Sequence, residues 1–594
     1  MKYNSKDLKE MSNAVRAAAL DAVLSAHSGH IGIVLGAADV VTTVFANFLH
    51  PARDRFILSA GHGSALLYAV LKLAGYNIGD LKSFRKMGGL PGHPEYGIDG
   101  VGATTGPLGQ GVGNAVGVAL AEKIKHSDGR VYCLCSDGDL MEGVAQESIA
   151  FAGRYGLNNL VLMWDDNGIS IDGTALTDVD IPSRMVAAGW KVISINGNDF
   201  NRINAALMGL GRSRKPVFIQ CRTVIGHGSS VAGTPRAHGY GLSDDELVEC
   251  VRAMQSPRGV ELWREHARAD ASRTATGMLS VDVPRIAFGG AMSDISTREL
   301  SGKYLEKILP HVPNLIGGSA DLGASTNAKT SVSRDILPPR FDGNYINYGV
   351  REHAMGAIMN GMATMGLRPY GATFLVFSDY LRPSIRLSAL SGLPVIYVFT
   401  HDSIAVGEDG PTHQPIEQLP SLRLIPNLNV FRPCNGEEVA AAWNTALRDT
   451  SRPSCMILSR QKISIVPAPR GADIEKGAYV IVPSSSRRVR ATIVATGAEV
   501  PLAIDVARRI GRGVQVVSMP CVEQFRNAPA DYKKSILRGY VVAIEAAASA
   551  SWFEFADAVV GIDEFGASGN GAAVYKHFGF DADVIARDIA RRIK

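Results

Sequence analysis

The sequence is poor in cysteine, and its few cysteines follow no pattern. Seven occur in 594 residues, and the closest pair, Cys133 and Cys135, lies in an apolar stretch that we interpret as a buried strand. An odd, scattered set argues against a disulfide framework and for free thiols in a reducing compartment. We therefore expect a cytoplasmic protein.

Long apolar runs and an excess of one charge are also absent. No stretch of eighteen apolar residues occurs, and the N-terminal region lacks a basic segment followed by an apolar one. The 61 Lys and Arg nearly balance the 57 Asp and Glu, and dense basic blocks are missing. We therefore expect a soluble protein with neither a membrane nor a nucleic acid as partner.

Strand-like apolar runs alternate with helical periods along the chain, which predicts an α/β fold with mostly parallel sheets. We expect three consecutive domains, at residues 1–255, 293–468 and 469–594, and a polar linker at 256–292. The predicted strands are RVYCLCS, LVLMW, WKVISI and PVFIQC in the first block, NLIGGS, YINYGV, PVIYVFT and CMILS in the second, and ATIVATG, VQVVSMP and YVVAIEA in the third.

The most informative stretch runs from residue 133 to 173 and reads CLCSDGDLMEGVAQESIAFAGRYGLNNLVLMWDDNGISIDG. Asp137 follows one predicted strand and Asn167 follows the next, 30 positions later, the length of one β-α-β unit. Such a unit puts both residues at the carboxyl edge of a parallel sheet, where ligands bind. A carboxylate, an amide oxygen and a backbone carbonyl suit Mg²⁺ that also binds phosphate oxygens. Residues that merely end strands and cap turns are the alternative interpretation.

This stretch resembles the thiamine-diphosphate motif, and its LMEG and DDNGISIDG halves are most similar to the transketolase family. The resemblance implies that Asp137, Asn167 and the carbonyl of Ile169 hold the metal, Mg²⁺ or else Ca²⁺ or Mn²⁺. It also implies that Gly138 approaches the diphosphate. Two residues depart from the usual pattern: Ser136 stands where glycine is usual, and Asp139 adds a negative charge.

The resemblance covers nearly the whole chain, in the order of the family. The matching segments are SGHIG (28–32), SAGHGSALLY (59–68), PGHPEYG (91–97), TTGPLGQGVGNAVG (104–117), YGVREHAMGAI (348–358), GATFLVFSDY (371–380), HDSIAVGEDGPTHQPIEQ (401–418) and LSRQ (458–461). It implies three domains, two of them thiamine-diphosphate-binding folds, with a third block that is structural and away from the chemistry.

Residues for the cofactor follow from the resemblance. Glu352 matches the acid that contacts the pyrimidine ring and activates thiazolium C2, and Phe377 matches the ring that stacks on the pyrimidine. A glutamate that only complements a helix dipole and a core aromatic stripe are the alternatives. The implied cofactor-binding residues are His62, Gly106, Pro107, Leu108, Gly138, Glu142, Asn167, His238, Glu352, Phe374, Phe377 and Tyr380.

Six of the 14 histidines fall inside matching motifs, and imidazoles can bind hydroxyls and move protons near pH 7. The resemblance makes Glu352, His238 and His413 catalytic, and it implies a grip on a terminal phosphate by arginines. The implied substrate-binding residues are His30, His93, Arg298, Ser325, His401, Asp409, His413 and Arg460.

The resemblance thus implies a transketolase reaction, in which a thiamine-diphosphate carbanion carries a two-carbon ketol unit from a ketose phosphate to an aldose phosphate, as in the pentose phosphate pathway. It implies a homodimer with active sites at the interface. Ile31, Pro235, Arg236 and a short stretch near 255–293 depart from typical members. Together with Ser136 and Asp139, they keep open a specialised ketolase with another aldehyde acceptor. A 1-deoxyxylulose-phosphate synthase and a non-catalytic transketolase-like protein are further alternatives.

Overall fold

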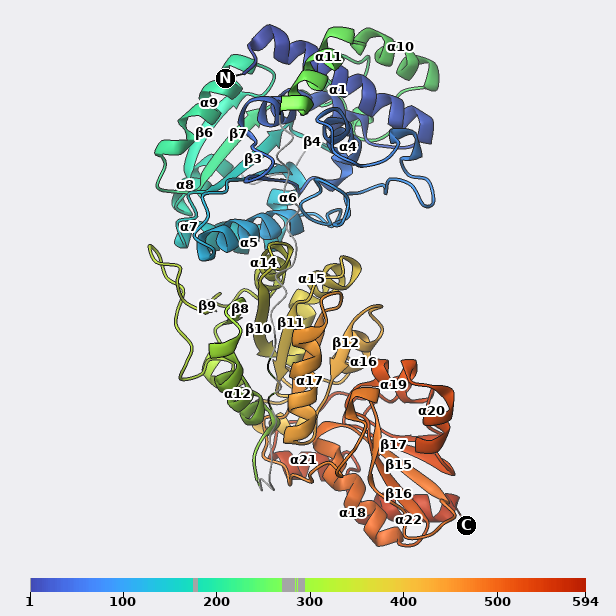
Figure 1. Cartoon of the computed structure of the whole chain (residues 1–594). Coiled ribbons are helices and arrows are strands. Elements are labelled where there is room, and N and C mark those ends of the chain that lie inside the picture. Colours follow the sequence, from blue (N-terminus) through green and yellow to red (C-terminus); the bar gives the residue numbers. More distant parts are fainter. Residues whose placement is uncertain (1, 175–179, 270–283, 285, 287–293, 594) are drawn as a thin grey trace. The chain divides into compact units, whose positions relative to one another are not determined.

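The structure of the protein is a computed structural model, which describes residues 2–174, 180–269, 284, 286 and 294–593 (Figure 1). The chain divides into two compact units. The first comprises residues 1–277, 337–342 and 357–366. The second comprises residues 278–336, 343–356 and 367–594, and it contains two of the three large sheets.

A parallel sheet forms the centre of the first unit, with the strand order β1-β2-β3-β7-β6. Its strands are β1 (Arg55–Leu58), β2 (Val131–Ser136), β3 (Leu160–Asp166), β6 (Lys191–Asn196) and β7 (Val217–Arg222). A small hairpin, β4 (Ile169–Ser170) with β5 (Gly173–Thr174), follows β3. Strands β2 and β3 are neighbours, and Ser136 pairs with Asp165 at their carboxyl ends. The expected β-α-β unit is therefore confirmed.

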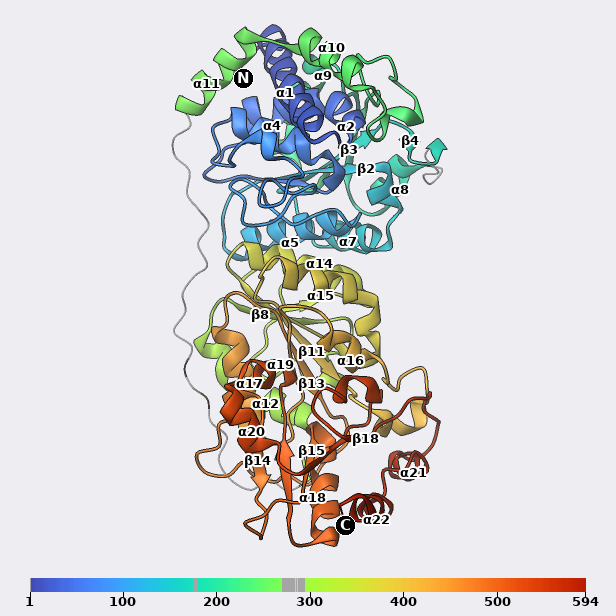
Figure 2. The same cartoon turned by 90° about the vertical axis from the view of Figure 1, so that its right-hand side faces the viewer.

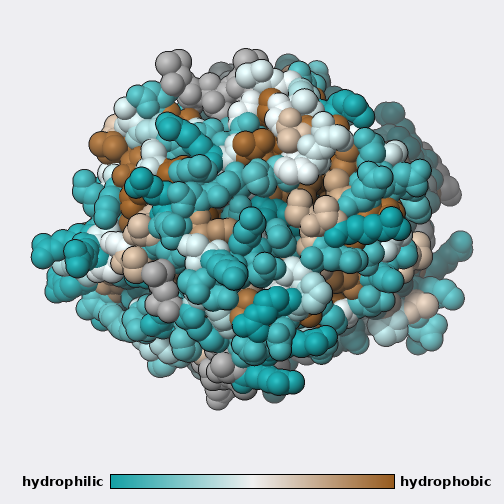
Figure 3. Space-filling view, turned by 90° about the horizontal axis from the view of Figure 1, so that it is seen from above, coloured by the Kyte–Doolittle hydropathy of each residue, from teal (hydrophilic) through white to brown (hydrophobic). Residues whose placement is uncertain are grey.

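Helices surround this sheet, with α5 and α7 side by side along it and α1 packed against α10 and α11 (Figures 1 and 2). The helices are α1 (Ser5–Ala26), α2 (Ile31–Gly36), α3 (Ala38–Thr43), α4 (Ser64–Leu73), α5 (Gln110–Ile124), α6 (Asp137–Met141), α7 (Gly143–Arg154), α8 (Ile181–Ala187), α9 (Phe200–Met208), α10 (Asp244–Met254) and α11 (Pro257–Ala269). Hydrophilic side chains dominate the face seen over α1, α10 and α11, with hydrophobic residues scattered between them (Figure 3).

The second unit begins with another parallel sheet, ordered β12-β13-β11-β10-β8-β9. Its strands are β8 (Leu315–Ser319), β9 (Tyr345–Asn347), β10 (Arg368–Phe374), β11 (Ile396–Thr400), β12 (Asn429–Phe431) and β13 (Ser454–Leu458). The helices of this part are α12 (Thr297–Ile308), α13 (Gly323–Thr326), α15 (Ser378–Leu390), α16 (Gln418–Arg423) and α17 (Gly436–Arg448). Helix α14 (Glu352–Thr364) begins in the second unit, and its residues from 357 onward belong to the first.

The last block of the second unit has a sheet ordered β14-β16-β15-β17-β18, parallel except for β14. Its strands are β14 (Tyr479–Val482), β15 (Ala491–Ala495), β16 (Val514–Ser518), β17 (Tyr540–Ile544) and β18 (Ala558–Val560). Its helices are α18 (Val500–Ile510), α19 (Val522–Asn527), α20 (Ala530–Ile536), α21 (Gly571–His577) and α22 (Ala582–Arg592). Every predicted strand overlaps an observed one, and the expected α/β fold with mostly parallel sheets is confirmed.

The segment that we expected to be a linker begins with helix α11 instead. Trp263 of α11 is fully buried and donates from Nε1 to the backbone oxygen of Met11 at 3.0 Å. Residues 270–283, 285 and 287–293 lie outside the described residues. All seven cysteines are described and are free thiols, as expected. Within the described ranges, every helix falls short of the length and apolarity that a bilayer crossing requires.

Candidate active site

The carboxyl ends of β2 and β3 bring Asp137 and the loop at Asn167 together. Asp137 is 3 % exposed, and its Oδ1 accepts a hydrogen bond from Trp164 Nε1 at 3.2 Å. Its other oxygen, Oδ2, is buried and has no partner among the described residues. A buried carboxylate oxygen without a donor costs free energy, so Oδ2 is available to a further ligand.

Electrostatics at this edge favour a cation. Burial, together with the nearby carboxylates of Asp165 and Asp166, raises the pKa of Asp137 to about 7. A bound divalent cation reverses that effect, because it stabilises the ionised form of the carboxyl group. Asp137, Asn167 and the carbonyl of Ile169 are hard oxygen donors at one sheet edge, so the residues fit the expected metal.

Asn167 is held in a defined orientation by its own loop. Its Nδ2 donates to Asp165 Oδ2 at 2.9 Å, and its Oδ1 accepts from the backbone N–H of Ile169 at 3.0 Å. A carboxylate can only accept, so the amide nitrogen must face Asp165. Thr223 Oγ1 donates to Asp165 at 2.5 Å and fixes that carboxylate in turn. The side chain of Asn167 is therefore preorganised.

Ser136 and Asp139, the two residues that depart from the family pattern, bond to each other. Ser136 and Asp139 make a capping box at the start of α6, in which each side chain bonds the other's backbone N–H. Asp139 is fully buried, and its carboxylate also accepts from Ser59 Oγ at 2.6 Å and from the backbone N–H of Gly109 at 2.7 Å. The extra negative charge is thus fully hydrogen-bonded within the protein.

The glycine-rich loop before α5 lies against the same turn. A Cβ at Gly138 would come within 2.8 Å of Leu108 Cδ1, and a Cβ at Gly109 within 2.7 Å of Glu142 Cβ. Gly106 adopts a φ of 140°, and a Cβ there would come within 3.3 Å of the His93 ring. Pro107 and Glu142 are exposed. Glycine at positions 138 and 109 therefore lets the loop and the turn after β2 pack closely, because a side chain there would crowd Leu108 or Glu142.

Four of the predicted histidines form one cluster in the first unit. The ring centroid of His30 lies 5.4 Å from that of His62, 6.4 Å from that of His93 and 5.6 Å from that of His238. Burial lowers the pKa of all four imidazoles, to about 4 for His30 and about 3 for His62. Neutral imidazoles can both donate and accept, which suits hydroxyl groups of a sugar.

The second unit holds the predicted pyrimidine residues. Glu352 begins α14, is 8 % exposed, and accepts from Thr373 Oγ1 at 3.0 Å through Oε1. Phe374 and Phe377 are stacked with centroids 5.7 Å apart, and Phe374 also stacks on His401 at 3.6 Å. Tyr380 lies 6.1 Å from Phe377 by ring centroids and is largely exposed.

The residues expected to grip a phosphate also converge. Arg298 donates to the backbone oxygen of Ser325, and its backbone N–H bonds Ser459, the neighbour of Arg460. The pKa of His401 is lowered to about 3 by burial and by the charges of Arg298, Arg460 and His413. His413 lies 5.4 Å from Phe377 by ring centroids, and the exposed Asp409 ends the short helix before it.

Comparison with known proteins identifies the chain. Residues 8–260 match the thiamine diphosphate binding domain of transketolase, 293–465 its pyrimidine binding domain, and 477–581 the transketolase-like C-terminal domain. The chain belongs to the transketolase family. It is 42 % identical to a transketolase of Cereibacter sphaeroides, over 98 % of each chain.

Solved transketolases agree with this assignment. The Campylobacter jejuni enzyme matches with a TM-score of 0.92 and 37 % identity, over 99 % of this chain and 100 % of that one. A Pichia stipitis transketolase, in complex with sedoheptulose 7-phosphate, matches with a TM-score of 0.91 and 36 % identity, over 99 % and 98 %. The expected transketolase family and its thiamine-diphosphate-binding folds are confirmed.

The sequence analysis missed Arg85, a charged neighbour of the histidine cluster, because it lies outside the segments that match the family. Arg85 lies 3.3 Å from His30 Nδ1 through Nη2, and its Nη1 donates to Ser28 Oγ at 2.6 Å. Its charge contributes to the lowered pKa of His30 and His93. Only its place within FRKMGGL (84–90), before two glycines, would have drawn attention to it, which is a weak signal.

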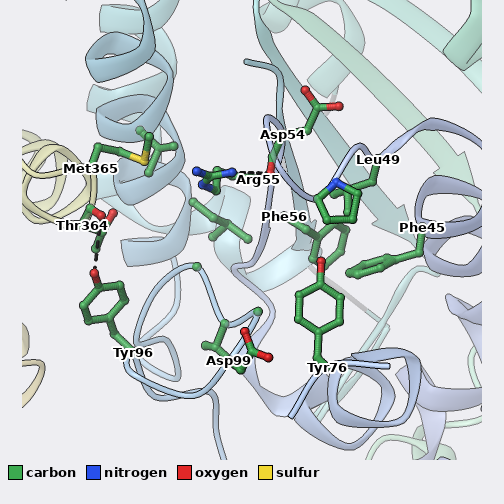
Figure 4. A pocket seen from close by; sticks show the side chains of 16 residues that line it. Phe45, Leu49, Asp54, Arg55, Phe56, Tyr76, Tyr96, Asp99, Thr364 and Met365 are labelled. Atoms are coloured by element: carbon green, nitrogen blue, oxygen red, sulfur yellow. Dashed lines mark hydrogen bonds between the residues drawn. The ribbon is translucent and has the colours of Figure 1, made fainter. Parts of the chain in front are cut away.

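A cavity of about 320 Å³ lies elsewhere in the first unit of this transketolase-family chain (Figure 4). Its wall includes Arg55 and Phe56 at the amino end of β1, together with Tyr76, Tyr96 and Met365. Tyr96 donates to the backbone oxygen of Thr364 across one side. None of the predicted cofactor residues, all of which the structure describes, lines this cavity, and Asp137 and Asn167 lie at the opposite, carboxyl ends of β2 and β3.

Proposed function

We propose that this chain transfers a two-carbon ketol unit from a ketose phosphate to an aldose phosphate, using thiamine diphosphate and a divalent cation, Mg²⁺ in the first place. The observation that carries the proposal is the unpartnered Oδ2 of Asp137 at the carboxyl edge of the first sheet, beside the oriented Asn167. A cation held there neutralises the diphosphate of the cofactor. Ca²⁺ or Mn²⁺ would use the same oxygen donors.

Thiamine diphosphate, when bound, supplies the carbon nucleophile that breaks and re-forms the bond next to a carbonyl. Glu352 is assigned to the hydrogen bond with the pyrimidine ring, and Thr373 fixes its carboxylate through Oε1. His238 and His413 move protons at substrate hydroxyls, and His30, His62 and His93 bind hydroxyl or cofactor oxygens. The lowered pKa of His30, His62, His93 and His238 keeps these four imidazoles neutral at pH 7, so each of the four rings retains one donor and one acceptor.

The substrate class follows from Arg298 and Arg460, whose charges both act on His401, and from the bond of Arg298 to Ser325. Two guanidinium groups suit a terminal phosphate better than a neutral sugar. The sedoheptulose 7-phosphate bound by the Pichia stipitis relative supports the same class. Asp409 would bond the C2 hydroxyl of the acceptor aldose.

We further propose a cytoplasmic homodimer in which each active site takes residues from both chains. The first unit holds the diphosphate and metal residues, and the second holds Glu352 and the aromatic residues.

Hybrid dimers, each with two differently substituted chains, test whether the active sites are shared. Neither Asp137→Asn nor Glu352→Gln chains should be active alone. Random co-assembly should restore about a quarter of the wild-type activity, because half of the dimers are hybrids with one intact site. Inactive mixtures in which hybrids have been verified would refute shared sites.

The reaction itself is tested with xylulose 5-phosphate and ribose 5-phosphate in the presence of thiamine diphosphate and Mg²⁺. Formation of sedoheptulose 7-phosphate by the wild-type protein, and its loss in Glu352→Gln, is the expected result. A wild-type protein that binds cofactor but makes no such product would sink the proposal.

A specialised acceptor remains the second candidate, favoured by the residues before His238. Pro235 and Arg236 are exposed in the turn that leads to His238, where they can alter the approach of an aldehyde. A panel of acceptor aldehydes ranked by kcat/KM decides between the standard transketolase reaction and a specialised ketolase. Ribose 5-phosphate in first place would favour a role in the pentose phosphate pathway, and another aldehyde far ahead of it would favour a specialised ketolase.

A further inference from the structure

The C-terminal block of the second unit contacts the segment of residues 401–414, which carries His401, Asp409 and His413. We propose that this block positions the segment for the sugar phosphate, through Tyr575 above all. The inference rests on the proposed function only in taking these three residues as substrate contacts. The block is expected from the family resemblance to be structural and remote from the chemistry, so this role is a new one for it.

The first tie runs through the hydroxyl of Tyr575 in α21. Its Oη lies 2.9 Å from Ser403 Oγ and 2.6 Å from Glu499 Oε1. Ser403 in turn caps the short helix Ile404–Asp409, because its Oγ accepts from the backbone N–H of Ala405 at 3.3 Å. The hydroxyl of Tyr575 thus connects a fully buried glutamate of the C-terminal block to the start of the helix that ends at Asp409.

A buried arginine makes the second tie. Arg432 is fully buried, and its Nε and Nη2 donate to Asp402 Oδ2 at 3.1 and 2.9 Å. Its Nη1 donates to Thr496 Oγ1 at 2.9 Å and also bonds Glu499. Hydrogen bonds between charged groups are strong when both partners are shielded from water and their geometry is good. Arg432 therefore holds Asp402, the residue directly after His401, to the C-terminal block.

The third tie is the side chain of Gln414, which is 3 % exposed. Its Nε2 donates to the backbone oxygens of Gly407 and Ala567, both at 3.0 Å. Gly407 has a φ of 79°, and a Cβ there would come within 3.0 Å of the oxygen of Gly569. The far end of the segment is therefore clamped between its own helix and residues 567–571.

The backbone of the segment explains why such support is needed. His401 has a φ of 61°, in the left-handed region that a residue other than glycine occupies at a cost of about 1 kcal/mol or more. Such a conformation persists only when neighbouring contacts determine it. Asp402 and Ser403, the next two residues, are the ones tied to Arg432 and Tyr575. The C-terminal block thus stabilises the backbone that aims His401 at Arg298 and Arg460.

The test compares Tyr575→Phe with Tyr479→Phe in the full-length protein. Tyr479 is a matched control, because its buried hydroxyl also joins the C-terminal block to its neighbour by donating to Glu438 Oε1 at 2.8 Å, away from residues 401–414. Both variants should lower the Tm. Only Tyr575→Phe should raise the KM of both sugar phosphates, by about tenfold for a lost bond to a charged group, with thiamine-diphosphate affinity almost unchanged.

Two further measurements make the result decisive. Ser403→Ala combined with Tyr575→Phe should raise the KM no more than Tyr575→Phe alone, because both changes break one connection. Hydrogen exchange at residues 404–413 should be faster in Tyr575→Phe than in Tyr479→Phe, and this readout needs no turnover. Equal exchange and equal KM in the two tyrosine variants would overturn positioning. An inactive wild type with the expected exchange difference would instead refute the proposed function alone.

Discussion

The carboxylate of Asp139 accepts a hydrogen bond from the backbone N–H of Gly109 at 2.7 Å. This bond joins the turn after β2 to the loop before α5, two segments that both contain predicted cofactor residues. The same carboxylate reaches Ser59, three residues before His62. Burial raises the pKa of Asp139. The carboxylate accepts four hydrogen bonds, from Ser59, from Gly109 and two from Ser136, which stabilise its ionised form and partly offset that rise. Asp139 is thus a central connection within the first half of the site.

Replacing Asp139 by asparagine should weaken thiamine-diphosphate binding. The amide nitrogen would face the donors of Ser136, and the loop at Gly109 would lose part of its support. We expect about tenfold lower cofactor affinity, because buried bonds to a charged group are lost. Titration followed by near-UV circular dichroism measures it. The exposed Asp128→Asn is the control, and equal affinity in the two variants would show that Asp139 does not position the loop.

Gly138→Ala should have a similar but smaller effect. The new Cβ would come within 2.8 Å of Leu108 Cδ1, so the side chain of Leu108, an implied cofactor-binding residue, must move. About fivefold weaker cofactor binding is expected, with the Tm of the cofactor-free protein nearly unchanged, because a flexible side chain can yield. Gly143→Ala is the matched control, because a Cβ at Gly143 meets nothing within 4 Å. This variant should bind thiamine diphosphate as tightly as the wild type.

Glu352→Gln should lower kcat by at least about two orders of magnitude, the typical contribution of a proton-transferring group. Glutamine keeps the size of the side chain and the bond from Thr373, so folding and cofactor binding should change little. Steady-state kinetics at saturating cofactor measures the effect. Glu437→Gln, which also changes a glutamate in the first turn of a helix, should keep full activity. Comparable kcat in both variants would contradict the role of Glu352.

The histidine cluster predicts acid lability. His62 has a pKa of about 3 in the folded protein and about 6.5 when unfolded, so the unfolded state binds more protons below pH 6.5. Its contribution to stability is complete above that pH and is lost as the pH falls toward 3. Between pH 6.5 and 5 the loss should be on the order of 1 kcal/mol.

Calorimetry of wild type and His62→Gln across this range isolates the effect. Asp137 and Asp165 act in the opposite direction, because their raised pKa values favour the folded state at low pH, and they are common to both proteins. The Tm of the variant should fall less steeply on acidification. Parallel curves would mean that His62 is protonated in the folded protein.

Much of the fold could be predicted from sequence, because the central strands are continuous apolar runs buried on both faces. Strands β1, β12, β14 and β18 and the β4–β5 hairpin were missed, since two to four residues carry too little pattern. Strand β10 was missed because it contains Pro369 and Gly371. The first helix of the expected linker was missed because its polar face dominates the composition. Trp263, the residue that packs it against α1, is one apolar residue among many charged ones.

By itself the sequence determined the α/β class, the family and the residues of the cofactor motif, because strand periodicity and motif spacing are local properties of the chain. Only the tertiary structure decided which side chains meet. Arg85 beside His30, Asp139 beneath Gly109, and Tyr575 on Ser403 are separated by 55, 30 and 172 positions, respectively. Hydrogen bonds between such distant residues depend on how the sheets and loops pack, which no local pattern records.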